Sequence, residues 1–209
     1  MDHAVERLIE HCRRELLGDP NHLLSFSSRR SLLKALGPLV LDARGYGREL
    51  SAGKRRRTEL AWRAAMRSVS AWEQGYGTLH AHSILDSVRA YLDGRATLES
   101  LEAQADAFQG ALLHDQRGNA AAYLAGRAAA AAAWVAVGDE MLVPDAGVTQ
   151  AGLDHPEDPD LWDAAFFAAG STAGGIPGAP AFDRDAYREF WLWYLDQAVP
   201  AACELGGQA

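Results

Sequence analysis

Apolar side chains recur along most of the chain at the three- and four-residue spacing of an amphipathic helix. In the first segment, for example, Val5, Leu8, Ile9, Cys12 and Leu16 fall on one face. Alanine is abundant, β-branched residues are scarce, and no run alternates apolar with polar residues over the length of a strand. The pattern therefore predicts an all-α fold, a single-domain antiparallel helical bundle of about seven to nine helices.

Capping residues and glycine or proline stop signals predict where each helix begins and ends. Pro38 is well placed to start a further turn, and loops are expected at 45–53, 143–159 and 174–180. We divide the chain into an N-terminal helical extension, 1–53, packed on or loosely joined to a bundle domain, 54–209. The expected helices run from the Asp2 cap to about Leu17, from the Ser27–Ser28 cap to Leu36, from about Lys54 to Glu73, from the Thr78 cap to Leu92, from the Thr97 cap to about Gln116, from Asn119 to Val137, from the Asp160 cap to about Gly170, and from Asp183 onward.

Three of these helices have distinctive faces. The helix over 119–137 is almost all alanine, so neighbouring backbones can approach it closely, and we expect it to be the central post of the bundle. Helix 54–73 carries one apolar and one polar stripe. The apolar stripe is Trp62, Ala65, Met66, Val69 and Trp72; the polar stripe is Arg56, Glu59, Arg63, Arg67 and Ser70. The last helix faces the core with Tyr187, Phe190, Trp191, Tyr194, Leu195 and Ala198.

Leu192 and Trp193 lie outside that last stripe, at roughly 130° from its centre at 100° per residue. Each needs a second neighbouring helix or a partner outside the chain. Packing against a neighbour is the first interpretation of Trp193. If it is exposed, it is the strongest candidate for an energetic anchor in an interface.

The net charge of −8 is unevenly spread. Residues 1–70 carry fourteen basic and eight acidic side chains, and residues 71–209 carry six basic and twenty acidic ones. The acidic part would repel nucleic acid and attract a basic protein. A cluster of acidic residues precedes and begins the helix near 160–170, where helix capping is the first interpretation and a contact patch the second. The predicted partner-binding residues are Asp154, Glu157, Asp158, Asp160, Asp163, Leu192 and Trp193.

The sequence disfavours a signal peptide, a membrane span, a metal site and a nucleic-acid-binding surface. The N-terminus does not follow the order of a signal peptide, and the apolar run Ala128–Val137 is too short to span a membrane, so we expect a cytoplasmic protein without membrane contact. His80, His82 and His114 with Asp115 lack the spacing of a metal site, so no metal or cofactor is expected. The basic run Lys54–Arg57 is expected to be a solvated helix face, and nucleic-acid binding through Arg55–Arg67 is a weaker alternative. Cys12 and Cys203 are expected to be reduced thiols.

A set of short segments occurs in an order and spacing that resembles a family of predicted immunity proteins from bacterial polymorphic toxin systems, family five. The segments cover about 54–203, and 76–83 departs from the family pattern. They are Trp72–Glu73 at a helix end, YLDG at Tyr91–Gly94, the alanine-rich helix ending in Trp134, WDAAFFAA at Trp162–Ala169, Gly174–Gly175, and REFWLWYLDQAVP at Arg188–Pro200.

The resemblance implies a helical protein, encoded beside a toxin, that binds and neutralises that toxin by occluding its active surface. It implies no catalysis and assigns no contact residues. The partner would be a cognate toxin, expected to be basic, and the oligomeric state stays open. The alternative is a helical ligand-binding or enzymatic domain with a tryptophan-lined pocket. That pocket would be formed by Trp72, Glu73, Trp162, Asp163 and Trp191.

Overall fold

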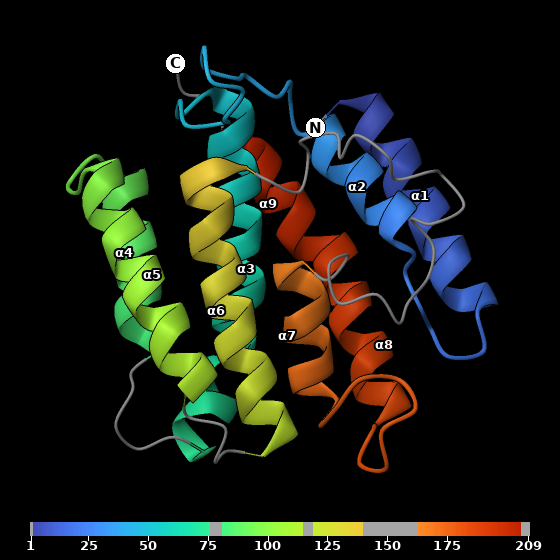
Figure 1. Ribbon diagram of the computed structural model, residues 1–209. Coiled ribbons are helices and arrows are strands. Elements are labelled where there is room, and N and C mark those ends of the chain that lie inside the picture. The colour runs from blue at the N-terminus through green and yellow to red at the C-terminus, as the bar shows by residue number, and fades with distance from the viewer. Residues whose placement is uncertain (1, 76–80, 115–118, 140–162, 206–209) are drawn as a thin grey trace.

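The computed structural model describes residues 2–75, 81–114, 119–139 and 163–205 (Figure 1). Within these ranges every regular element is helical, which confirms the all-α prediction. The elements stand side by side, with α4 and α5 at one end of the molecule and α1 and α2 at the other (Figure 1). They are α1 (His3–Gly18), α2 (Phe26–Ala35), α3 (Ala52–Gly75), α4 (Ala81–Leu92), α5 (Leu98–His114), α6 (Ala120–Gly138), α7 (Ala164–Thr172), α8 (Arg184–Trp193), the π-helical turn η4 (Tyr194–Ala198) and α9 (Val199–Glu204).

The alanine-rich helix α6 lies in the middle of the bundle, as predicted, and contacts α3, α4, α5 and α7. Its small side chains let larger groups approach the helix axis. A Cβ atom added at Gly126 would lie only 2.3 Å from the ring of Trp72 on α3. Among the described helices, α6 alone is long and apolar enough to cross a membrane, but most of it is buried within the bundle, as in the core helix of a folded domain.

The C-terminal run α8–η4–α9 carries the densest aromatic packing. The Asp183 carboxylate accepts hydrogen bonds from the N–H groups of Asp185 and Ala186, which confirms the predicted cap. The whole predicted stripe from Tyr187 to Ala198 is buried. The π-helical turn η4 comes directly before Val199 and Pro200. In a regular α-helix the proline ring would clash with the carbonyl four residues earlier, and a wider turn relieves that clash.

Some predicted helix boundaries were wrong by a few residues. α2 begins at Phe26 because the Ser25 hydroxyl, not Ser27 or Ser28, accepts the capping hydrogen bond, at 3.2 Å from the N–H of Ser28. α3 begins at Ala52, inside the expected loop 45–53, and Pro38 starts no helical turn. The Thr78 cap lies outside the described residues. The predicted cap of α7, Asp160, also lies outside them, and the helix is capped by Asp163, whose carboxylate accepts from the N–H of Phe166 at 2.8 Å.

The first two helices pack on the rest of the bundle. α1 contacts α2, α8 and η4, and its side chains Cys12 and Leu16 are fully buried. The Glu15 carboxylate accepts hydrogen bonds from the Ser25 N–H, at 2.7 Å, and from the Ser28 hydroxyl, which joins α1 to the start of α2. The division of the chain at residue 53 stays a prediction.

Candidate partner-binding site

The basic run Lys54–Arg57 lies in the first two turns of α3 and has a different role from the predicted solvated face. Lys54 and Arg57 are each only 1% exposed, so for these two residues the prediction was wrong. All four side chains donate hydrogen bonds to main-chain carbonyls at or just beyond the C-terminal ends of other helices. These carbonyls accept no hydrogen bond within their own helix, and they carry partial negative charge. The bonds run from Lys54 to Val137 (3.0 Å), from Arg55 to Leu92, from Arg56 to Leu36 (3.1 Å) and from Arg57 to Gly37 (2.6 Å).

Arg57 also forms a buried ion pair with Asp139, the residue that ends α6. The guanidinium Nε lies 2.9 Å from both carboxylate oxygens, and Nη2 lies 2.5 Å from one of them. Asp139 is 2% exposed and has a φ of 57°, a left-handed conformation that aspartate tolerates better than most residues. Lys54 lies nearby, and burial lowers the pKa of its ammonium group from 10.5 to about 8, while the carboxylate of Asp139 opposes that shift.

A second buried ion pair joins Arg29 of α2 to Asp163, the residue that precedes α7. The Arg29 Nη1 lies 2.8 Å from the Asp163 carboxylate, and the two side chains are 3% and 8% exposed. The same guanidinium lies over the rings of Phe166, at 5.0 Å, and Trp191, at 6.0 Å. The first interpretation of Asp163, helix capping, is confirmed, whereas its burial and its pairing with Arg29 remove it from the predicted contact patch.

Asp139 and Asp163 are the described residues on either side of the segment 140–162. That segment holds six acidic residues and no lysine or arginine. Both flanking carboxylates are thus buried and neutralised by arginines from the first 57 residues of the chain. The two ion pairs therefore hold Asp139 and Asp163, the residues on either side of the acidic segment, against the bundle.

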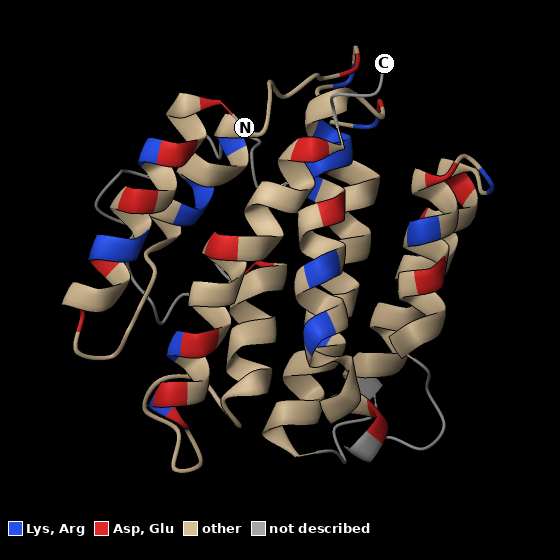
Figure 2. Ribbon diagram, turned by 180° about the vertical axis from the view of Figure 1, so that it is seen from behind, with Lys and Arg blue, Asp and Glu red and all other residues tan. Residues whose placement is uncertain are grey.

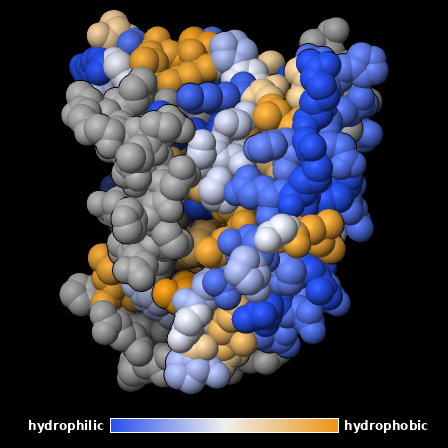
Figure 3. Space-filling model, turned by 90° about the vertical axis from the view of Figure 1, so that its right-hand side faces the viewer, coloured by the Kyte–Doolittle hydropathy of each residue, from blue (hydrophilic) through white to orange (hydrophobic). Residues whose placement is uncertain are grey.

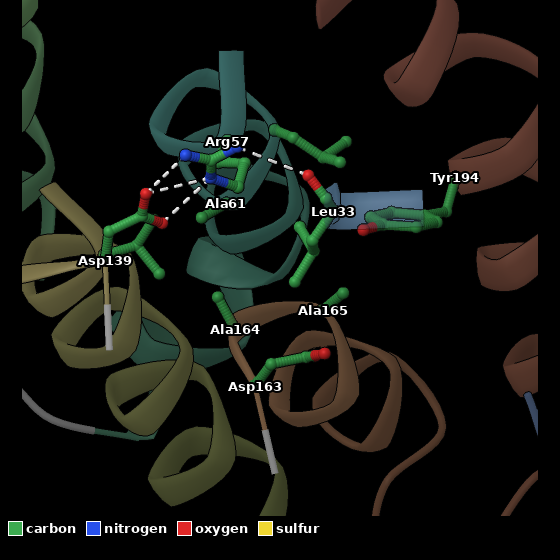
Figure 4. Close-up of a pocket in the computed structure, with 10 residues that line it drawn as sticks. Leu33, Arg57, Ala61, Asp139, Asp163, Ala164, Ala165 and Tyr194 are labelled. Carbon is green, nitrogen blue, oxygen red and sulfur yellow. Dashed lines mark hydrogen bonds and ion pairs between the residues drawn. The ribbon is translucent and has the colours of Figure 1, made fainter. Parts of the chain in front are cut away.

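A small cavity lies between these two ion pairs, lined by side chains from α2, α3, α6, α7 and η4 (Figure 4). In Figure 4 Arg57 and Asp139 point toward each other on one side, and Asp163 lies at the start of α7 below. The volume of this cavity is about 20 Å³, room for roughly one water molecule. Pockets that bind small molecules are typically at least about 300 Å³, so this cavity is too small for a ligand.

The alternative tryptophan-lined pocket is not assembled among the described residues. Trp72 is fully buried against Phe108, with ring centroids 5.9 Å apart, whereas Trp191 is buried among the other rings of α8 and η4. The side chain of Glu73 is 54% exposed and pairs with His82 at 2.8 Å. Trp162 lies outside the described residues. Trp191 and Asp163 share a neighbour, Arg29, whose guanidinium pairs with the Asp163 carboxylate and lies over the Trp191 ring.

The remaining candidate residues are the histidines and the two cysteines. His82 belongs to the pair with Glu73, and no group of metal-ligating side chains occurs among the described residues. The side chains of His80 and His114, with Asp115, lie outside the described part. Cys12 and Cys203 are unpaired thiols, and burial raises the pKa of Cys12 to about 12, which keeps it protonated and unreactive.

Of the predicted partner-binding residues, Leu192 and Trp193 are described and are half-buried on α8, while Asp154, Glu157, Asp158 and Asp160 lie outside the described residues. The Trp193 ring packs beside Phe190, with centroids 5.5 Å apart. The Arg67 guanidinium of α3 also lies over the Trp193 ring, 4.4 Å from its centroid. The contact with Arg67 agrees with the first interpretation of Trp193, packing against a neighbouring helix.

A second arginine lies over a tryptophan where the outer face of α3 meets α4. Arg89 of α4 lies 4.0 Å from the ring centroid of Trp62, whose indole N–H donates to the Leu85 carbonyl at 3.0 Å. Glu59, a member of the predicted polar stripe, is 1% exposed, and Arg63 and Arg89 both pair with its carboxylate, each at 2.8 Å. Basic residues follow one another along α3 on the side seen in Figure 2. By contrast, the described residues on the side of the molecule on which α1 lies are mainly hydrophilic, with separate apolar patches among them (Figure 3).

In the described part of the chain, the buried charged side chains either form ion pairs, as Arg57 and Asp139 do, or bind main-chain carbonyls, as Lys54 does. The family model for Immunity protein Imm5 matches residues 9–201. The chain belongs to this family. The match begins inside α1 and ends inside α9, so it covers α2 as well as the segments from 54 onward that carried the resemblance. Membership implies an immunity function and a non-enzymatic role. Comparison with curated proteins gave no match.

Proposed function

We propose that this protein neutralises a cognate bacterial toxin in the cytoplasm by binding it and covering its active surface. The observation that carries the proposal is membership of the immunity family over nearly the whole chain. The cavity beside Arg57 has room for about one water molecule, and a larger hollow beside Ile84 and Phe108, of about 220 Å³, is also smaller than a typical ligand pocket. Both observations favour a role through surface contact over one through a bound ligand.

The acidic segment between the two buried ion pairs is our first candidate for the contact surface. We expect Asp154, Glu157, Asp158 and Asp160 to attract a basic toxin, and Leu192 with Trp193 to add apolar contact area. Such a division of roles is common, because charges mainly raise the rate of association and buried aromatic residues mainly lower the rate of dissociation. Because Asp163 is buried, it is no longer part of this proposed surface.

Co-expression tests the proposal. The toxin domain encoded by the neighbouring gene should arrest growth when expressed alone, and growth should be restored when this chain is expressed with it. A variant with Asn or Gln at Asp154, Glu157, Asp158 and Asp160 should protect less well. The matched control neutralises four exposed acidic residues elsewhere and should protect normally: Glu10, Asp86, Asp93 and Asp106. Protection lost equally in both variants would refute the assigned surface, and no protection by the unmodified chain would refute the function.

A further inference from the structure

We infer that the outer face of α3 is a second contact surface, which binds carboxylate groups of the toxin. We call it the guanidinium–tryptophan face, and it consists of Trp62, Arg63, Arg67, Arg89 and Trp193. The inference rests on the proposed function and adds to it the chemistry of the partner, which would carry acidic groups as well as the basic ones that the acidic segment attracts.

Two arginines on this face are held in place by tryptophans. The Arg67 guanidinium carbon lies 4.4 Å from the centroid of the Trp193 ring, and that of Arg89 lies 4.0 Å from the centroid of Trp62. Both are well inside the distance of about 6 Å at which cation–π attraction is significant. Arg63 lies between the two stacks, one helical turn or about 6 Å before Arg67 along α3.

The charges on this face do not cancel. Arg63 and Arg89 share one carboxylate, that of Glu59, which is buried beneath them. Arg67 is exposed and has no ion pair with any residue that the structure describes. Three guanidinium groups and one carboxylate leave a net charge of +2 on the guanidinium–tryptophan face. The face is therefore locally basic on a chain whose net charge is −8.

Stacking prepares these arginines to bind carboxylates. A guanidinium that lies over an aromatic ring uses its planar face, so its N–H groups remain available at the edge to form paired hydrogen bonds with a carboxylate. Part of the side-chain entropy that binding would remove has already been lost in the free protein. Arginine and tryptophan are also the residue types that contribute most often to the affinity of protein interfaces.

The charge distribution favours protein carboxylates over a nucleic acid. Binding to a polyanion needs an extended basic field, and residues 71–209 carry fourteen more acidic than basic side chains. The buried Glu59 further limits the local charge. A few carboxylates on a folded partner can reach this face without bringing a long run of negative charge against the acidic part of the chain.

Single substitutions at Arg67 test the inference, with binding of the full-length chain to the toxin domain measured by calorimetry. Arg67→Met should raise the dissociation constant about tenfold or more. Arg67→Lys, which keeps the charge but loses the planar fork, should raise it at least about threefold. The matched control is Arg14→Met, which removes an exposed arginine on α1 and should change the constant less than about twofold. Equal effects of Arg67→Met and Arg14→Met would overturn the inference.

A second arm separates failure of this inference from failure of the proposed function. If the unmodified chain does not bind the toxin domain, the proposed function fails, and the face is tested with a hexaglutamate peptide by ¹⁵N NMR. The indole signals of Trp62 and Trp193 and the Nε signal of Arg67 should shift with hexaglutamate and not with hexalysine. The absence of shifts would overturn the inference, and so would a stronger response to a hexathymidylate strand, which would indicate nucleic-acid binding.

Discussion

Replacing Asp139 by Asn should strongly destabilise the fold, because it leaves the Arg57 guanidinium buried without a counter-charge. Asparagine has nearly the same size as aspartate and also tolerates the φ of 57°, so the change mainly removes charge. Breaking a buried pair by removing one partner typically costs about 3–5 kcal/mol. Arg57 keeps its bond to the Gly37 carbonyl, at 2.6 Å, so we expect the lower end, about 3 kcal/mol. A domain of ordinary stability has about 5–15 kcal/mol in total.

Urea unfolding followed by far-UV circular dichroism measures this difference. The matched control is Asp196→Asn, which breaks the ion pair between Asp196 and Arg13. These two side chains are 43% and 32% exposed, so the substitution should change the free energy of unfolding by less than about 1 kcal/mol. If Asp139→Asn does not fold, the double variant Arg57→Met/Asp139→Asn, which removes both charges, should recover much of the stability. Equal effects of Asp139→Asn and Asp196→Asn would refute the reasoning.

Two further predictions concern glycine substitutions and a buried lysine. Gly110→Ala, at a site in α5 with nothing within 4 Å of the added Cβ, should raise the free energy of unfolding by about 0.5–1 kcal/mol. Gly126→Ala should lower it by at least about 1 kcal/mol, because its methyl group would lie 2.3 Å from the Trp72 ring. If urea unfolding shows that both substitutions stabilise the protein, the packing of α6 is contradicted. Lys54, with its pKa lowered to about 8, loses its proton in the folded chain before the unfolded chain does. Above that pH the unfolded state therefore binds more protons than the folded state, so the free energy of unfolding rises with pH. The difference in this free energy between the wild type and Lys54→Met should increase by about 2 kcal/mol between about pH 7.5 and 9.5. A difference that stays constant or falls would contradict this prediction.

Local signals in the sequence were enough to predict most of the helices. Asn119 and Asp183 cap α6 and α8 as expected, because a capping side chain bonds to N–H groups only two or three residues away. The core stripe of α8 and η4 was also predicted, because the 3.6-residue period determines which side chains share a face. These features depend on neighbours within a few residues along the chain.

The buried charges could not be placed by the same reasoning. Arg57 and Asp139 are separated by 82 residues, and helical periodicity identifies a face but not the distant group that covers it. One local signal was available. Four cations in the first two turns of α3 lie near the positive end of the helix dipole, which disfavours them. A run such as Lys54–Arg57 near a helix start therefore indicates side chains that bind groups elsewhere in the fold. Here they bind the C-terminal carbonyls of α2, α4 and α6.

Titration of the toxin's own activity with the purified chain tests the central claim most directly, because occlusion and catalysis predict different endpoints. If the protein acts by covering the active surface, inhibition should be complete at about one equivalent of chain per toxin. The toxin should also regain its activity, chemically unchanged, when the complex is separated under denaturing conditions and the toxin is refolded. Complete inactivation at a small fraction of one equivalent, or a toxin that stays inactive after separation, would contradict a protein that protects by binding alone.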